Sequence, residues 1–212
     1  MTSPIKVLLV DDHAVVREGY RRLLEEEPSI RVVGEAGNGE QACERANALG
    51  PDVVVMDIAL PGTSGIEATR HMFKDQPRLR ILMFSMYDDA IYATRALEAG
   101  ALGYLSKASA PEVLVQAIYA VSRGERYVSP DVATNMARSA ARPGRSEIEA
   151  LSPREFEVLR LLVQGETVRS ISEKLALSEK TVANHQSAIR EKLGARNSAQ
   201  LARLVAQVGG SR

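Results

Sequence analysis

The sequence predicts an α/β domain built on a doubly wound, five-stranded parallel sheet, followed by a small all-α domain. Three observations indicate this organisation. Short apolar segments alternate with amphipathic ones over the first part of the chain, a pattern typical of a parallel sheet covered on both faces. From residue 151 onward the pattern is helical only. The charge balance also changes: residues 1–137 carry 14 basic and 19 acidic side chains, whereas residues 151–212 carry ten and six.

Five short, mostly apolar and β-branched segments are expected to form the buried strands. Five such strands in about 120 residues fit a flavodoxin-like sheet, whose ligands bind beyond the carboxyl ends of the strands. In chain order the segments are IKVLLV (5–10), IRVVGEA (30–36), DVVVMD (52–57), LRILMFS (79–85) and ALGYLSK (101–107).

The segments between the strands predict helices. In HAVVREGYRRLLEEE, apolar Val16, Tyr20, Leu23 and Leu24 recur at the spacing of one helical face. The next helix, over 40–49, is followed by a Gly-Pro pair, and the fourth ends before Gly100, a residue suited to a helix C-terminus. Further helices are expected near 65–74, 88–99 and 111–122, the last beginning with a proline.

We expect three regions along the chain: residues 1–125 as the first domain, 126–149 as a linker and 150–212 as the second domain. Residues 131–139 can form a short helix within the linker. The segment from Ser139 to Ala150 is rich in Ala, Arg, Ser, Pro and Gly, a composition typical of linkers.

Composition excludes several classes of protein. With 45% hydrophobic and 25% charged residues, the chain is neither disordered nor collagen-like. Cys43 is the only cysteine, so there is no disulfide framework. No apolar run approaches the ~20 residues of a membrane helix, and nothing is typical of a signal peptide. We therefore expect a cytoplasmic protein without membrane association.

Polar side chains stand at the ends of four of the five predicted strands: Asp11-Asp12, Asp57, Ser85 and Lys107. Because the carboxyl ends of parallel strands meet at one edge, we expect these groups to form one site. Clustered carboxylates require a cation, and oxygen ligands suit Mg²⁺ or Mn²⁺. A carboxylate beside such a metal can attack a phosphoryl group, while an ammonium and a hydroxyl bind the transferred oxygens.

Each of these residues also has a simpler interpretation. Asp12 or its neighbour can cap the helix that follows, Lys107 can be a solvated surface lysine, and the Ser85 hydroxyl can bond to backbone. Their joint placement at strand ends favours the site.

The segments VDDH, MDIALPGTSG, FSM and GYLSK resemble the receiver domain of two-component response regulators, over residues 5 to about 125. The resemblance implies that Asp57 accepts a phosphoryl group from a sensor histidine kinase. It implies that Mg²⁺ is held by Asp11, Asp12, Asp57 and the backbone carbonyl of Ala59. It also implies that Ser85 and Lys107 sense the phosphoryl group and that Tyr104 is a rotating aromatic switch.

The second domain shows four helix starts. Ser152 to Glu155 form a capping box with proline at the first helical position, and Thr167 and Ser178 are N-caps of the next two helices. Asn197 to Gln200 resemble another capping box. The short interval at Ala176–Ser178 is the spacing of a helix-turn-helix.

The third of these helices has two faces: Val182, Ile189 and Leu193 on one, and Lys180, Asn184, Ser187 and Glu191 on the other. Any small helical bundle with a solvated polar face would show this pattern. The short turn, the basic charge and the small outer side chains favour insertion into a DNA groove. Lys180 and Arg190 are expected at phosphates, and Asn184 can pair with adenine.

This part of the chain resembles the LuxR-type output domain through LSPRE, ISEKL, SEKTV and KLG. Together the two domains resemble the NarL/FixJ class of response regulators. The resemblance places Lys180, Thr181, Ala183, Asn184 and Ser187 at DNA. The chain departs from the class at Ala183, where a basic residue is common, and at Gln186, where an apolar one is usual. A fourth helix with apolar Leu201, Leu204, Val205 and Val208 can pack on its own domain or pair two output domains, and we favour pairing.

The sequence thus predicts a phosphorylation-controlled, sequence-specific DNA-binding transcription regulator that is not an enzyme. Its expected partners are a sensor histidine kinase, promoter DNA and a second copy of itself, with RNA polymerase as a further candidate. Two alternatives stay open. An aspartyl-phosphate phosphatase would also use Asp and Mg²⁺, although it usually carries D-x-D where this chain has Ala59. A constitutive DNA-binding protein could use its receiver for dimerisation alone.

Overall fold

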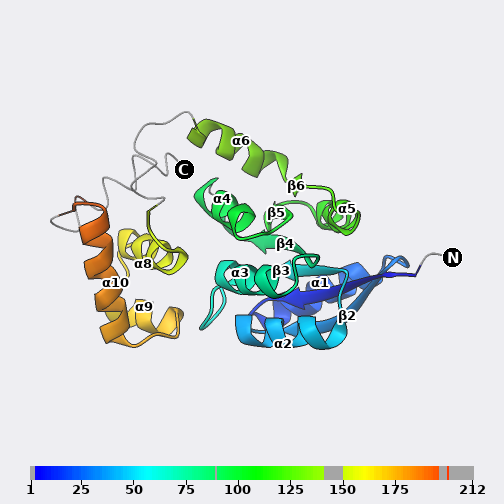
Figure 1. The fold of residues 1–212 in the computed structure, drawn as a ribbon, viewed down its shortest axis with the longest axis horizontal. Helices are drawn as coiled ribbons and strands as arrows, with labels where there is room; N and C mark the ends of the chain where they lie inside the picture. Colours follow the sequence, from blue (N-terminus) through cyan, green and yellow to red (C-terminus); the bar gives the residue numbers. More distant parts are fainter. Residues whose placement is uncertain (1–2, 89, 141–149, 196–199, 201–212) are drawn as a thin grey trace. The chain divides into compact units, whose positions relative to one another are not determined.

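The computed structural model describes residues 3–88, 90–140, 150–195 and 200. The chain divides into two compact units, with the boundary between Met136 and Ala137. The first contains a parallel sheet with its helices, and the described part of the second is helical (Figure 1). The predicted α/β domain followed by an all-α domain is therefore confirmed.

All strands of the sheet are parallel, in the order β2-β1-β3-β4-β5-β6. The sheet has six strands where five were predicted. The additional strand, β6, has only two residues, which pair with Gly103 and Tyr104, and so short a strand has no pattern of its own in the sequence. The bounds are β1 Ile5–Val10, β2 Ile30–Ala36, β3 Val53–Met56, β4 Arg80–Ser85, β5 Gly103–Ser106 and β6 Tyr127–Val128.

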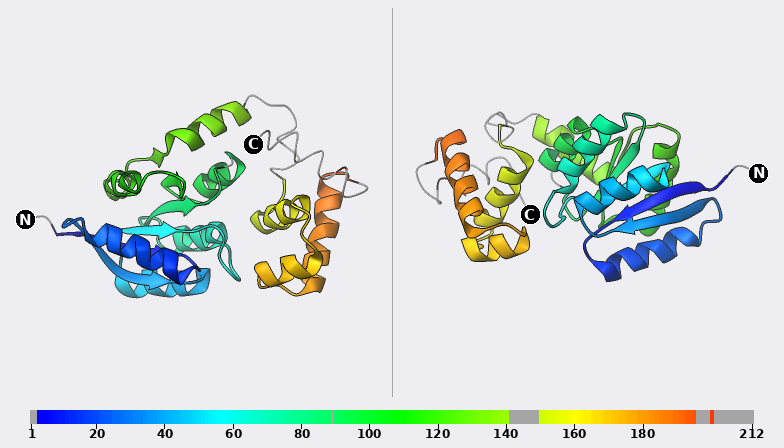
Figure 2. Two further views of the ribbon diagram at one scale, coloured as in Figure 1. Left: turned by 180° about the vertical axis from the view of Figure 1, so that it is seen from behind. Right: turned by 60° about the horizontal axis from the view of Figure 1, so that its bottom comes forward.

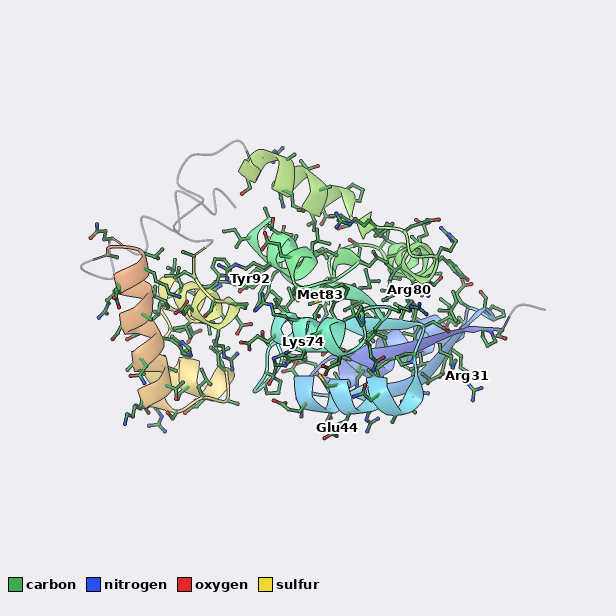
Figure 3. The ribbon with its side chains drawn as sticks, viewed as in Figure 1. Arg31, Glu44, Lys74, Arg80, Met83 and Tyr92 are labelled. Carbon is green, nitrogen blue, oxygen red and sulfur yellow. The ribbon has the colours of Figure 1, made fainter. Side chains whose placement is uncertain are left out.

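Helices cover both faces of the sheet (Figure 2). On one face, Leu24 and Ile118, from the first and fifth helices, pack in a single apolar cluster with residues of β1, β3 and β4. On the other face, Met83 of β4, labelled in Figure 3, accepts a hydrogen bond from the Thr69 hydroxyl of the third helix. Strands buried on both faces need continuous apolar runs. The helices are α1 Ala14–Glu25, α2 Gly39–Leu49, α3 Gly65–Asp75, α4 Ala90–Glu98 and α5 Pro111–Ser122.

Helix α4 ends as the sequence predicted. Gly100, just beyond it, has a φ of 110°, which side chains other than glycine rarely adopt. The ring of Phe73 fills the adjacent space, so that a Cβ on Gly100 would lie 2.4 Å from its Cγ. Glycine is required there both by conformation and by packing.

A further helix, α6 (Pro130–Ala140), follows β6. It covers the residues for which a short helix was predicted. Val132 on this helix is fully buried. The last part of the predicted linker, residues 141–149, lies outside the described residues.

The second unit contains α8 Pro153–Val163, α9 Val168–Lys174 and α10 Glu179–Lys192. The predicted capping box is present, because the side chains of Ser152 and Glu155 each accept a hydrogen bond from the other's backbone amide. Thr167 and Ser178 cap α9 and α10 as predicted. Val182, Ile189 and Leu193 are buried. The predicted fourth helix, with its apolar stripe, lies outside the described residues apart from Gln200.

In the part of the chain that the structure describes, none of the helices has the length and apolar character needed to cross a bilayer.

Gly65 offers a test of how closely the chain packs beside β3. A Cβ at this position would lie 1.8 Å from the Asp57 carbonyl oxygen, whereas one on Gly19, an exposed residue of helix α1, would meet nothing within 4 Å. We expect Gly65→Ala to lower the free energy of unfolding by at least about 1–3 kcal/mol through overpacking. Gly19→Ala should raise it by roughly 0.5–1 kcal/mol. Urea unfolding followed by circular dichroism measures both; equal stability of the two variants would contradict the close approach.

Candidate functional site

The predicted site residues lie at the carboxyl edge of the sheet. Asp11 and Asp12 follow β1, Asp57 follows β3, Ser85 ends β4 and Lys107 follows β5. These four strands are neighbours in the sheet, so their ends are adjacent. The order of the strands reverses beside β1, which makes this edge the place where parallel sheets bind ligands.

The Lys107 ammonium joins two of the three carboxylates. Its Nζ lies 2.5 Å from Asp11 Oδ2 and 2.6 Å from Asp57 Oδ2, and all three side chains are at most 8% exposed. The Lys107 ammonium lies over the face of the Phe84 ring, with Nζ 5.9 Å from the ring centroid. Water is thus largely excluded from a cluster of two negative charges and one positive charge.

The Asp57 carboxylate is also held by backbone amides. Its Oδ1 accepts hydrogen bonds from the amides of Ile58, at 2.6 Å, and Ala59, at 3.4 Å. The Asp57 amide donates to the carbonyl of Val10 at 2.9 Å. One oxygen therefore faces the loop after β3, and the other faces Lys107.

Burial and charge act on this cluster in opposite directions. Burial raises the pKa of the Asp57 carboxyl, and the contact with Lys107 offsets only part of that effect. Burial also acts to lower the pKa of Lys107, but Asp57 and Asp11 more than compensate, so the pKa of the ammonium is raised. Lys107 therefore stays charged, and the net effect on Asp57 is to favour its protonated form more than in a fully hydrated carboxyl.

Asp12 and His13 extend the cluster toward solvent. Ligand atoms of Asp11, Asp12 and His13 all lie within 4.8 Å of one another, and His13 Nδ1 is 2.7 Å from Asp12 Oδ1. The alternative that Asp12 caps α1 is not supported, because the N-cap residue is His13 and no side chain caps this helix. Instead, Asp11 Oδ1 accepts a hydrogen bond from the His13 amide at 2.7 Å. Carboxylate oxygens predominate, a donor set suited to hard divalent cations.

Ser85 and Tyr104 lie beside the cluster and share a neighbour. Both side chains are fully buried. Ser85 Oγ accepts a hydrogen bond from the Tyr87 amide at 3.3 Å, and the Tyr104 hydroxyl donates to the Tyr87 carbonyl at 2.6 Å. Among the described residues, the Ser85 hydroxyl makes no hydrogen bond with Asp57 or Lys107. The segment after β4 is thus hydrogen-bonded to both Ser85 and Tyr104.

Arg17 was not identified from the sequence. Its Nη1 donates to the Asp11 carbonyl, and its Nε donates to Glu35 Oε2 at 2.7 Å, so it fixes the start of the β1–α1 connection. Nothing in the sequence pattern distinguishes it from the neighbouring arginines of α1.

In the second unit, the outer face of α10 is accessible. Thr181 is half-buried, and its hydroxyl is hydrogen-bonded to that of the N-cap residue Ser178. The Ser187 hydroxyl donates to the Ala183 carbonyl. By contrast, the side chains of Lys180, Asn184 and Arg190 form no hydrogen bond or ion pair within the described residues. Gln186 is half-buried, at the margin of the core face. The exposed members of the predicted set are Lys180, Ala183, Asn184, Ser187 and Arg190.

Polar contacts from α8 reach the turn before α10 and the end of α10 itself. Arg154 contacts Glu157 at 2.7 Å and donates to the Leu175 carbonyl at 2.6 Å, in the turn before α10. Lys192 reaches Glu155 Oε2 at 2.7 Å. The sequence identified Glu155 only as a capping residue; these additional contacts orient the exposed face of α10.

Two family models match the chain. The model of the response regulator receiver domain matches residues 7–119, and the model of bacterial regulatory proteins of the luxR family matches residues 149–205.

Relatives with the same organisation match nearly the full length. The chain is 40% identical to the response regulator GacA of Pseudomonas syringae over 207 residues, 97% of each protein. It is also 40% identical to the response regulator UvrY of Escherichia coli K12, covering 97% of this chain and 95% of the relative.

Solved structures of response regulators are also similar to this chain. A LuxR-family two-component response regulator from Aurantimonas sp. SI85-9A1 is 48% identical, with a TM-score of 0.63 over 65% of this chain and 99% of that chain. The structure of RcsB from Salmonella enterica serovar Typhimurium was solved bound to promoter rprA in the presence of phosphomimetic BeF₃⁻. It is 28% identical, with a TM-score of 0.67, and the match covers 97% of this chain and 100% of that chain. The chain belongs to the NarL/FixJ class of response regulators, which join a receiver domain to a LuxR-type DNA-binding domain.

Proposed function

We propose that this response regulator accepts a phosphoryl group on Asp57 and that this modification controls promoter binding through α10. The observation that carries the proposal is the contact of the Lys107 ammonium with both Asp11 and Asp57 at the carboxyl edge of the sheet. A buried carboxylate beside a fixed cation suits an acyl phosphate, whose additional negative charge needs such a partner. We assign residues 1–125 to the receiver, 126–149 to the linker and 150–212 to the DNA-binding domain.

The donor is the phosphohistidine of a sensor histidine kinase. A carboxylate oxygen of Asp57 forms a bond to phosphorus while the bond from phosphorus to the imidazole nitrogen breaks, and the imidazole leaves with the bonding pair. Lys107 provides a fixed positive charge for the transferred oxygens. The amides of Ile58 and Ala59 hold the attacking carboxylate in place.

A divalent cation, Mg²⁺ or Mn²⁺, fits the donors beside this reaction centre. The carboxylates of Asp11, Asp12 and Asp57 would hold it together with the backbone carbonyl of Ala59. When bound, it supplies the positive charge that offsets the phosphoryl oxygens and the third carboxylate. The raised pKa of Asp57 is consistent with this requirement, because Lys107 alone does not fully compensate its burial.

Ser85, Tyr104 and Lys107 would sense the phosphoryl group. Ser85 and Tyr104 share hydrogen bonds with Tyr87, so a phosphoryl group that engages Ser85 shifts a segment bonded to Tyr104. The response is a change in population toward a dimerising receiver. RcsB, which is similar over its whole length, has been solved bound to promoter DNA and as two dimers on parallel DNAs. We infer the same assembly here, in the cytoplasm, with RNA polymerase as a further partner.

The proposal is favoured over its two alternatives. An aspartyl-phosphate phosphatase usually has a second aspartate two residues beyond the nucleophile, where this chain has Ala59. A constitutive DNA-binding protein whose receiver only dimerises would not need Lys107 buried between two carboxylates.

Phosphorylation at Asp57 is tested by mass spectrometry. With Mg²⁺ and acetyl phosphate, the wild type should gain one phosphoryl group and Asp57→Asn none, because the amide cannot form an acyl phosphate. Asp75→Asn, on an exposed residue at the end of α3, is the matched control and should label like the wild type. Chelation of Mg²⁺ should abolish labelling. Undiminished labelling of Asp57→Asn would overturn the assignment.

Base recognition is tested at Asn184. Asparagine can pair bidentately with adenine, and removing that pair should reduce discrimination by about 1–3 kcal/mol at one base of the site. A selection on random duplexes should yield two symmetric half-sites about one helical turn apart for the wild type. Asn184→Ala should lose the preference at one base per half-site.

Lys180→Ala is the control for that experiment. Since Lys180 is assigned to a phosphate, its loss should weaken binding to all sequences alike and reduce the salt dependence by about one counterion. Recovery of identical base preferences by wild type and Asn184→Ala would show that Asn184 does not contact bases.

A further inference from the structure

Hydrogen bonds connect the loop after β4 to β5. The Tyr87 amide donates to Ser85 Oγ at 3.3 Å, and the Tyr104 hydroxyl donates to the Tyr87 carbonyl at 2.6 Å. The ring of Tyr87 also stacks on that of Tyr92, with centroids 4.6 Å apart. Tyr92, labelled in Figure 3, comes from α4, so this loop is tied to both β5 and α4.

The same loop and the same strand residue hold the start of α6. The Ser129 amide, just before α6, donates to the Tyr104 carbonyl at 3.1 Å. Farther along α6, Asn135 Nδ2 donates to the Asp88 carbonyl at 3.0 Å. Ser129 and Val132 are fully buried, so this end of α6 is packed as well as bonded. In Figure 1, α6 leaves β6 and runs past α4.

These contacts form a closed ring. It runs from Tyr87 through Tyr104 and Ser129 into α6, and returns through Asn135 to Asp88, the neighbour of Tyr87. A loop that moves must therefore break the bond to Asn135 or carry α6 with it. The boundary between the two compact units falls within α6, directly after Met136. The chain passes from the receiver to the DNA-binding unit through this helix.

We propose that the bond from Asn135 to Asp88 is a latch that holds α6 on the receiver until the Ser85 hydroxyl engages a phosphoryl group. This inference rests on the proposed function. When Ser85 turns toward the phosphoryl group, it releases the Tyr87 amide, and the loop gives up its bonds to Tyr104 and Asn135 together. The Asn135–Asp88 hydrogen bond and the contact of Ser85 with the phosphoryl group favour opposite conformations of the loop. Each therefore lowers the equilibrium constant for forming the other by the same factor.

Asn135→Ala in the full-length chain removes the latch. Thr134→Ala is its matched control, because the neighbouring Thr134 hydroxyl donates to the Pro130 carbonyl within α6 and, among the described residues, forms no hydrogen bond with the loop. Both substitutions introduce the same residue into the same helix. Amide hydrogen exchange of residues 131–136 and 86–88 is measured before and after treatment with Mg²⁺ and acetyl phosphate, and labelling of Asp57 is followed by mass spectrometry.

In the wild type, phosphorylation should accelerate exchange in both segments. Unphosphorylated Asn135→Ala should already exchange about two- to tenfold faster there than wild type, the range that one hydrogen bond gives, and phosphorylation should add little. Thr134→Ala should behave like wild type. If unphosphorylated Asn135→Ala exchanged as slowly as wild type, the latch would be overturned. The latch would also be overturned if wild type were phosphorylated at Asp57 and the exchange of α6 did not change. Wild type that takes up no phosphoryl group at Asp57 would instead overturn the proposed function.

Discussion

The contact of Lys107 with Asp11 and Asp57 is the interaction on which the receiver site depends. Two carboxylates at the edge of a buried sheet repel each other and lose hydration, and a fixed ammonium between them offsets part of both effects. The parallel register brings the three residues together from three different strands. Gly65 contributes by allowing α3 to begin against the Asp57 carbonyl.

One ammonium does not neutralise the whole cluster. Asp12 adds a third carboxylate, and a phosphoryl group would add further negative charge, so the proposed chemistry needs a divalent cation. The site is coupled to the rest of the chain through Ser85, whose hydroxyl holds the loop that carries Tyr87 and Asp88. Because that loop bonds to both Tyr104 and Asn135, a change in charge at Asp57 can reach the helix that leads to the DNA-binding unit.

Much of this was predictable from the sequence, for identifiable reasons. Strands buried on both faces produce continuous apolar runs, and the polar residues that end them mark the site. Helix caps such as Ser152 and Ser178 act over three residues and are visible locally. The contacts that were not predicted depend on backbone carbonyls that lie outside the helix of the donor side chain: Arg17 to Asp11, Asn135 to Asp88 and Arg154 to Leu175. No pattern of side chains encodes the position of such carbonyls, and β6 is too short to form a pattern.

The most direct measurement is a ¹³C NMR titration of the Asp57 carboxyl in the metal-free protein, for wild type and Lys107→Met. If the ammonium compensates the burial of Asp57, its replacement by an uncharged side chain of similar length must favour the protonated carboxyl. The pKa of Asp57 should then be higher in Lys107→Met than in wild type, while Lys107→Arg should stay closer to wild type. An equal or lower pKa in Lys107→Met would contradict the central role of this contact.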